Sequence, residues 1–328
     1  MAVKVTAQGV DLTKYPLSGG ENLLCSLAAS CVAEAVTYPF EVAKVRLQIQ
    51  GSRALLPVKF TGMFDSMIKV GRNEGLMALM AGLPSGLLRH SIAGTMRLGL
   101  YDPTISYLNY GTFEKPTDPS ELKEVQLWQR MLASSSTGAV AMVFANPADL
   151  VKTKLQASIK PAPGQKVPFK GTVSCFKYIM ATEGVAGLFH GLKIAVPRMA
   201  WQNMAEVTAY DLTKDLLRKH YGMEDGLPLF FLGSLSAGFF GAYLGNPLDC
   251  IKTRIYRNEL GPDGKPLYSG PIDALTKMIR NEGVLSLWKG VVPLWIHVSA
   301  FSVAVFVTFD MLRLQVRKSK ARQDGHDI

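Results

Sequence analysis

Three copies of one charged motif, a proline followed by an acid, a lysine and a second base, recur along this chain about every 100 residues. The copies read PFEVAKVR from Pro39, PADLVKTK from Pro147 and PLDCIKTR from Pro247. A single acid and lysine at helical spacing is ordinarily a surface pair worth a few tenths of a kcal/mol. Because a long repeat determines architecture, we predict one body of three units, at residues 1–115, 116–222 and 223–328.

Six apolar segments precede or follow these motifs, near residues 22–50, 83–108, 128–158, 192–218, 227–258 and 290–316. None is an uninterrupted run of roughly 18 apolar residues, as expected for a simple membrane anchor, because each carries ionisable residues. Such groups cost roughly 2.5–3.5 kcal/mol each inside a span and usually face a bundle interior or a water-filled cavity. With a mean hydropathy of +0.14, the pattern favours an all-α membrane transporter.

The net charge of +10 is compatible with nucleic acid, anionic lipid or an anionic solute as the partner. Nucleic acid is disfavoured because the bases are dispersed through apolar segments instead of gathering on one polar face. The cysteines (Cys25, Cys31, Cys175 and Cys250) have neither C-x-x-C nor metal-site spacing. No nucleophile with a base and no phosphate-cradling glycine loop is found, so we predict no enzyme, no cofactor and no metal. The first 20 residues lack the apolar core of a secretory signal.

Each unit is predicted to hold a long helix, a polar loop, a short amphipathic helix that ends in Glu-Gly, and a second long helix. A short helix with one apolar face is typical of a membrane interface. Glycines begin the short helices (Gly62, Gly171 and Gly270) and the second long helices (Gly82, Gly191 and Gly290). Free backbone N–H groups at such helix starts can hold a phosphate. Ordinary capping in a soluble helical repeat is the alternative.

Together with the aromatic-x-glycine and the Glu-Gly-x4-aromatic-basic-Gly that follow it, the triple motif resembles the mitochondrial carrier family over essentially the whole chain. The stretches PFEVAKVRLQIQG, MRLGLYDP and NMAEVTAYD are most similar to the uncoupling-protein branch, with the oxoglutarate and dicarboxylate carriers close by. This resemblance implies six tilted transmembrane helices with pseudo-threefold symmetry around a cavity. It also implies three short matrix-side helices, cardiolipin at the six glycines, alternating access in the mitochondrial inner membrane, and a monomer.

The motif charges are expected to form a matrix-side gate. By analogy with the family, the pairs are Glu41 with Lys152, Asp149 with Lys252, and Asp249 with Lys44. Gln48 and Gln156 resemble glutamines that brace such pairs, whereas the third repeat has Tyr256 at that position. Ion pairs suit a gate because their Coulomb attraction nearly cancels their desolvation cost. A same-helix pair, three residues apart, is the alternative for each motif.

The second long helices end in aromatic-acid-x-x-base, which resembles a cytoplasmic gate. Its residues are Asp102, Asp211 with Lys214, and Asp310 with Arg313. The first copy departs from the pattern, because Ile105 replaces the base. We therefore expect the pairs Lys214–Asp310 and Arg313–Asp102 and an Asp211 without a partner. Such a weakened outer gate would favour a state open to the intermembrane space.

Arg89 and Arg198 occupy matching positions in the first and second repeats, and His297 stands at the third. The resemblance to uncoupling proteins implies arginine at all three positions, where the three side chains would hold the phosphates of an inhibitory nucleotide. Because His297 replaces the third arginine, the resemblance does not extend to nucleotide inhibition. With Arg97 and Asn203, these side chains form the predicted substrate site. Arginine binds carboxylates well, which favours small anions such as dicarboxylates. The alternatives are snorkelling or structural arginines and a core histidine.

Glu34 and Glu206 are predicted cavity acids and candidates for proton movement, because a partly desolvated carboxyl can hold a proton. Glu34 could instead pair with a cavity arginine. The leading interpretation is therefore a carrier that exchanges small carboxylates. One alternative is fatty-acid-dependent proton leak as the main activity. Another is a non-transporting structural subunit of a respiratory complex, suggested by Met80-Ala81 and Ile105, which break the motifs of the first unit.

Overall fold

The computed structural model describes residues 6–7, 10–11, 15–49, 60–114, 124–158, 171–224, 226–257 and 266–324. Six long helices dominate it, two in each repeat. They are α1 (Gly19–Ile49), α3 (Leu83–Tyr110), α4 (Leu127–Ala157), α7 (Leu192–Tyr221), α8 (Leu227–Arg257) and α10 (Val291–Gln323). These bounds agree with the six predicted apolar segments to within a few residues, apart from α10, which extends further along the chain.

The short helices also lie where the sequence predicts them. Each repeat has one amphipathic helix: α2 (Met63–Asn73), α5 (Thr172–Thr182) and α9 (Pro271–Glu282). A single further turn follows each: η2 (Leu76–Met80), α6 (Gly184–Leu188) and η4 (Val284–Trp288). The described strands, β1 (Thr6–Ala7) and β2 (Val10–Asp11), form one small antiparallel pair. Most of the polar loops fall outside the described residues.

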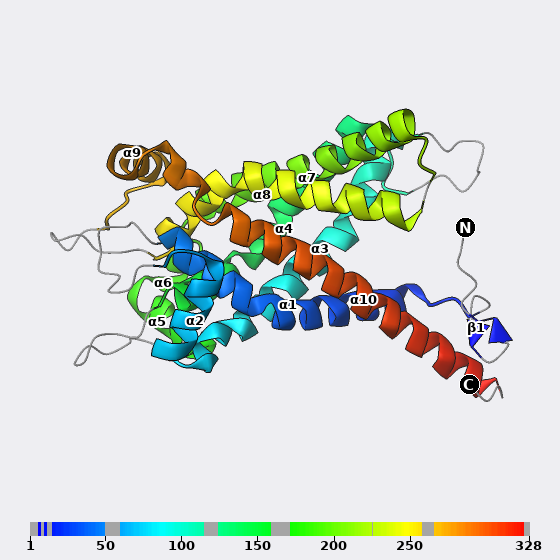
Figure 1. The fold of residues 1–328 in the computed structure, drawn as a ribbon, viewed down its shortest axis with the longest axis horizontal. Helices are drawn as coiled ribbons and strands as arrows, with labels where there is room; N and C mark the ends of the chain where they lie inside the picture. The colour runs from blue at the N-terminus through cyan, green and yellow to red at the C-terminus, as the bar shows by residue number, and fades with distance from the viewer. Residues whose placement is uncertain are drawn as a thin grey trace.

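The long helices form a closed ring, in which α10 packs against α1, α3 against α4, and α7 against both α4 and α8. Figure 1 shows them running along the long axis of the molecule, with α2, α5 and α9 at one end and the two chain termini at the other. The prolines Pro39, Pro147 and Pro247 lie inside α1, α4 and α8. The three charged motifs therefore gather at the end where the short helices lie.

The outside of the ring is apolar. Three segments are long and apolar enough to cross a membrane on length and composition alone: Gly19–Ile49, Pro228–Arg257 and Val284–Gln323. Large apolar side chains are exposed on several helices, for example Val36, Phe144, Phe231 and Phe306. Many charged side chains, in contrast, are buried inside the ring. This inversion of the usual soluble pattern is what a lipid-facing bundle with a polar interior requires.

One interaction repeats three times and ties the start of each second long helix to the ring. The residue before each motif proline donates a side-chain hydrogen bond to a carbonyl beside the next helix start. The bonds are Tyr38 Oη to Ala81 O (3.0 Å), Asn146 Nδ2 to Leu188 O (2.9 Å) and Asn246 Nδ2 to Leu287 O (2.8 Å). These hydrogen bonds therefore connect each first long helix to the segment that precedes the second long helix of the same repeat.

Candidate functional site

Three ion pairs between different helices close the inner end of the bundle. Lys152 Nζ lies 2.6 Å from Glu41 Oε2, Lys252 Nζ lies 2.7 Å from Asp149 Oδ2, and Lys44 contacts Asp249. Each acid thus reaches the lysine of a neighbouring repeat, as the family resemblance implies, and the alternative of same-helix pairs is wrong. All six side chains are nearly excluded from solvent. We call these three pairs the inner ring.

The residues at the three predicted brace positions, Gln48, Gln156 and Tyr256, make different contacts with the inner ring. Gln48 donates a hydrogen bond to Asp249 Oδ2 (3.0 Å) and accepts one from Thr253 Oγ1 (3.0 Å). Gln156 is buried, but its Nε2 has no hydrogen-bond partner among the described residues. At the third position, the ring of Tyr256 lies beneath the ammonium group of Lys252, 5.2 Å from Nζ. An aromatic ring can stabilise that cation in place of an amide.

Two arginines from the second long helices contact the inner ring. Arg89 Nε on α3 lies 3.6 Å from Asp149 Oδ1, and Arg198 Nε on α7 lies 2.9 Å from Asp249 Oδ1. Two of the three acids of the inner ring therefore contact both a lysine and an arginine. The spacing of the sequence predicts that these arginines face the interior, but it does not reveal that they pair with the gate acids.

The third gate acid has a different environment. Glu41 lies beside Glu34 and His297, with one potential ligand atom of each residue within 4.8 Å of the others. Lys152 Nζ contacts Glu34 Oε1 (2.7 Å) as well as Glu41. Three such groups could hold a metal ion, but the lysine ammonium already occupies the space between the two carboxylates. Glu34 is thus an additional acid beside the inner ring.

His90 is a site residue that the sequence reasoning missed. Its Nε2 lies 3.0 Å from Glu34 Oε2 and 2.6 Å from Arg89 Nη2. The rings of His90 and His297 both stack on Phe301, at centroid distances of 5.2 and 6.3 Å. The pattern gave no signal for His90, because the other repeats have no histidine at the corresponding position. Contact with Glu34 and Arg89 links His90 to both carboxylate and guanidinium groups of the site.

The last base of each motif forms a second set of ion pairs, which the sequence reasoning also missed. These are Arg46 with Glu74 (2.9 Å), Lys154 with Glu183 (3.2 Å) and Arg254 with Glu282. The signal was present, because each acid belongs to the Glu-Gly that ends a short helix. Burial raises the pKa of Glu282, but hydrogen bonds from Arg254 and Lys289 outweigh it and leave that pKa below its usual value. These pairs fasten the short helices to the ring.

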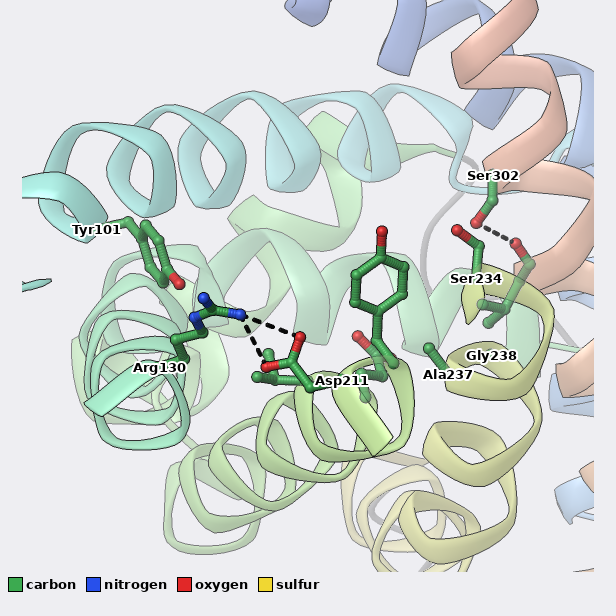
Figure 2. Close-up of a pocket in the computed structure, with 11 residues that line it drawn as sticks. Tyr101, Arg130, Asp211, Ser234, Ala237, Gly238 and Ser302 are labelled. Carbon is green, nitrogen blue, oxygen red and sulfur yellow. Dashed lines mark hydrogen bonds and ion pairs between the residues drawn. The ribbon is translucent and has the colours of Figure 1, made fainter. Parts of the chain in front are cut away.

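A cavity of about 480 Å³ lies toward the other end of the bundle. Its lining comes from α3, α4, α7, α8 and α10 and includes Tyr101, Glu206 and Ser302. Figure 2 shows Tyr101, Arg130 and Asp211 grouped at one side of this cavity and Ser302 at the other. Glu206 accepts a hydrogen bond from Gln202 Nε2 (2.8 Å). The structure therefore has a closed inner ring and a cavity on the opposite side of it.

The predicted cytoplasmic pairs are not formed in this conformation. Asp102 and Asp310 are exposed and have no ion pair among the described residues. Lys214 Nζ lies over the rings of Tyr210 (5.3 Å) and Phe230 (4.8 Å), and the guanidinium of Arg313 lies over Phe309 (5.0 Å). We call the acids Asp102, Asp211 and Asp310, with Lys214 and Arg313, the outer rim.

The expectation that Asp211 has no partner is wrong. Arg130 Nη1, near the start of α4, donates hydrogen bonds to Asp211 Oδ1 (3.2 Å) and Oδ2 (3.1 Å), as Figure 2 shows. The prediction failed because it considered only bases at the same position of the other repeats, and Ile105 is not a base. Arg130 lies on the first long helix of its repeat, whereas the predicted bases lie on the second long helices, so a search at matching positions gives no signal for it.

Two residues of the predicted substrate site lie away from the inner ring. Arg97 is exposed and has no ion pair among the described residues. Asn203 is buried between α7 and α4, where its Nδ2 donates a hydrogen bond to Ser134 O (3.0 Å) and lies against Gly138. This engaged amide contributes to helix packing. We therefore leave Asn203 out of the proposed substrate site.

All six glycines that the sequence predicts as helix starts are helix N-caps in the structure: Gly62, Gly82, Gly171, Gly191, Gly270 and Gly290. Those of the second long helices, including Gly191 at φ 76°, have a left-handed backbone that favours glycine. A Cβ at Gly191 would lie 2.6 Å from a ring carbon of Tyr256. Both conformation and space therefore require glycine there.

Comparison with known proteins agrees with this architecture. Residues 15–111, 123–221 and 226–320 each match the family described as "Mitochondrial carrier protein". "Mitochondrial uncoupling protein 1" of Arabidopsis thaliana is 34% identical over 94% of this chain and 97% of its own length. "Mitochondrial uncoupling protein 2" of the same plant is 33% identical over 94% of this chain and 96% of its own length. The human protein UCP3 is 34% identical, with the same coverage as the second plant protein.

A closed helical ring with three matching repeats and a buried ion-pair network thus defines a membrane carrier of small solutes. The chain belongs to the mitochondrial carrier family, and its curated relatives include uncoupling proteins. It is accordingly a multi-pass protein of the mitochondrial inner membrane. Members of this family are transporters.

Proposed function

We propose that this carrier exchanges small di- or oxo-carboxylates across the inner membrane by alternating access. One observation carries the proposal: Arg89 and Arg198 contact Asp149 and Asp249, two acids of the inner ring. A substrate carboxylate competes with these acids for the same guanidinium groups, because arginine binds carboxylates through its fixed fork of donors. Substrate binding therefore weakens the matrix gate at two of its three acids, and this couples occupancy to opening.

The charge of the cluster supports an anionic substrate. Its cations are Lys44, Lys152, Lys252, Arg89 and Arg198, and its acids are Glu34, Glu41, Asp149 and Asp249. The cations exceed the acids by one, and Arg97 adds a further positive charge on α3. A cavity with excess positive charge attracts small anions and repels cations. A substrate with two negative charges would neutralise the excess positive charge of the cluster and of Arg97.

The proposal includes an anionic phospholipid such as cardiolipin at the inner ends of the helices. It is supported by two glycine N-caps in each repeat, one on a short helix and one on a second long helix. The partial positive charge and free N–H groups of a helix start favour a phosphate. Delipidated protein should lose thermal stability and regain it with added cardiolipin but not with a neutral phospholipid; equal recovery with both would contradict this part.

Reconstitution in liposomes tests the proposed transport. Vesicles loaded with malate should take up labelled malate, oxoglutarate or aspartate in exchange, and Arg89→Gln and Arg198→Gln should each reduce this uptake. Lys277→Gln is the matched control, because Lys277 forms a partly exposed pair with Asp273 on α9, away from the cavity. Proton conductance that depends on fatty acid, without carboxylate exchange, would replace the proposal with proton leak. Binding to a large respiratory complex with neither activity would favour a structural subunit.

A further inference from the structure

The outer rim has fewer cations than acids. Asp102, Asp211 and Asp310 occupy the same position on α3, α7 and α10, but only Lys214 and Arg313 follow them three residues later. Ile105 stands at the corresponding position of α3. If the rim came together with these side chains alone, one carboxylate would be left without a cation. Burying an unpaired charge is strongly unfavourable, so this sequence needs a further base if its outer end is to close.

Arg130 occupies the right place for that base. It lies one turn into α4, next to α7, and one of its guanidinium nitrogens contacts both oxygens of Asp211. Its side chain is 43% exposed, and that of Asp211 is 17% exposed. In this conformation the pair is therefore partly hydrated and contributes little to stability. The pair becomes important only when the outer rim closes and excludes water from it.

We infer that Arg130 supplies the third cation of the outer rim and replaces the base that is absent at Ile105. This inference rests on the proposed alternating access and identifies a positioning residue for it. Arg130 neutralises Asp211 on α7, so that Lys214 and Arg313 have only Asp310 and Asp102 to compensate when the rim closes. The rim then closes with three compensated acids, one of them compensated within a repeat instead of between repeats.

The inference predicts an unequal effect on transport and on stability. Arg130→Gln should lower the maximal exchange rate roughly tenfold, because closing the rim then buries an unpaired carboxylate. It should leave the melting temperature of the purified protein almost unchanged, since the pair is hydrated in the open conformation. Arg130→Lys should retain most of the activity. Asp211→Asn in the Arg130→Gln background should restore exchange, because it removes the charge that Arg130 compensates.

A second measurement makes the test independent of the substrate. Ser302→Cys places a thiol in the lining of the outer cavity, and a membrane-impermeant maleimide applied from the outer side reports how often that cavity is open. Arg130→Gln should increase the labelling rate of this cysteine several-fold, and Asp211→Asn should reverse the increase. Lys277→Gln is the control, with a side chain 45% exposed in a pair of similar kind.

The outcomes separate this inference from the proposed function. Absence of carboxylate exchange in the unsubstituted protein would refute the proposed function, whereas the labelling measurement would still test Arg130. If Arg130→Gln changes neither exchange nor labelling, the inference is wrong. It is also wrong if Asp211→Asn fails to reverse the defects, because a simple loss of helix packing by Arg130 would not be repaired by neutralising an acid.

Discussion

Lys152 contributes more to the inner ring than Lys44 and Lys252, because its ammonium group contacts two carboxylates, those of the buried Glu34 and of the largely buried Glu41. Glu34 Oε1 and Glu41 Oε2 lie 2.7 and 2.6 Å from Nζ, and the Lys152 side chain is 2% exposed. Lys152→Gln would leave both acids without this cation, although Glu34 retains His90 at 3.0 Å. We predict that this substitution is the most damaging of the three lysine-to-glutamine changes in the ring.

The other two gate acids keep a guanidinium partner when their lysine is lost. Lys44→Gln leaves Asp249 with Arg198 at 2.9 Å, and Lys252→Gln leaves Asp149 with Arg89 at 3.6 Å. Removing one charged hydrogen bond costs about 1.5–3 kcal/mol, whereas breaking a buried pair costs about 3–5 kcal/mol. The free energy of unfolding should therefore fall furthest for the variant at position 152, by about 2 kcal/mol more than for the others.

Thermal unfolding of the purified protein in detergent checks this ranking. Since 1 kcal/mol shifts the melting temperature by roughly 2–4 °C in chains of a few hundred residues, the extra loss should be roughly 5 °C. Glu34→Gln in the Lys152→Gln background should recover part of it, because only one acid is then left uncompensated. Equal losses for the three lysine variants, or a double variant no more stable than Lys152→Gln, would refute the reasoning.

Three further predictions follow from particular contacts. Gly138→Ala should destabilise α4–α7 packing by about 1–3 kcal/mol, because its Cβ would lie 1.9 Å from Asn203 Nδ2, and Asn203→Ala should relieve the loss in thermal unfolding. Burial raises the pKa of Cys175 on α5 to about 11, so maleimide at pH 8 should label it only after unfolding; rapid labelling of the folded protein would contradict this. Tyr256→Phe loses the hydrogen bond from its hydroxyl to Asn146 Oδ1 (2.6 Å) and should cost about 1 kcal/mol, whereas Tyr107→Phe, on an exposed ring, should cost less.

The fold and the inner ring could be predicted because symmetry repeats their signals. A proline, an acid and a lysine at one position in each unit indicate which side chains come together, and the family resemblance implies how they pair. The six helix starts follow in the same way, since glycine recurs at both positions of every repeat. Pairing between neighbouring repeats needs only that the helices close into a ring.

Two contacts of the site could not be predicted, because they depart from the symmetry, whereas the pairs between the last base of each motif and a Glu-Gly acid are symmetric and were missed although their signal was present. Glu34 is predicted as a cavity acid, but its contact with His90 is not, because both residues belong to the first repeat alone and their contact depends on the rotation of α3 against α1. Arg130 compensates for a missing base from a neighbouring helix at a different position in the repeat. A base at this different position keeps the charge balance of the rim, but a search for bases at matching positions of the three repeats does not find Arg130.

The departures at Glu34, His90 and His297 give the three acids of the inner ring unequal environments. Asp149 and Asp249 each contact an arginine that a carboxylate substrate could draw away. Glu41 instead shares Lys152 with Glu34 and lies near His297, which offers no permanent charge for an anion to compete for. A substrate with two carboxylates therefore has two matched contacts, and it can loosen two pairs of the ring while the third still holds α1 against α4. Under the proposed function, the two pairs that involve arginine-bound acids would therefore open before the pair of Glu41 with Lys152, an order that threefold symmetry alone would leave undetermined.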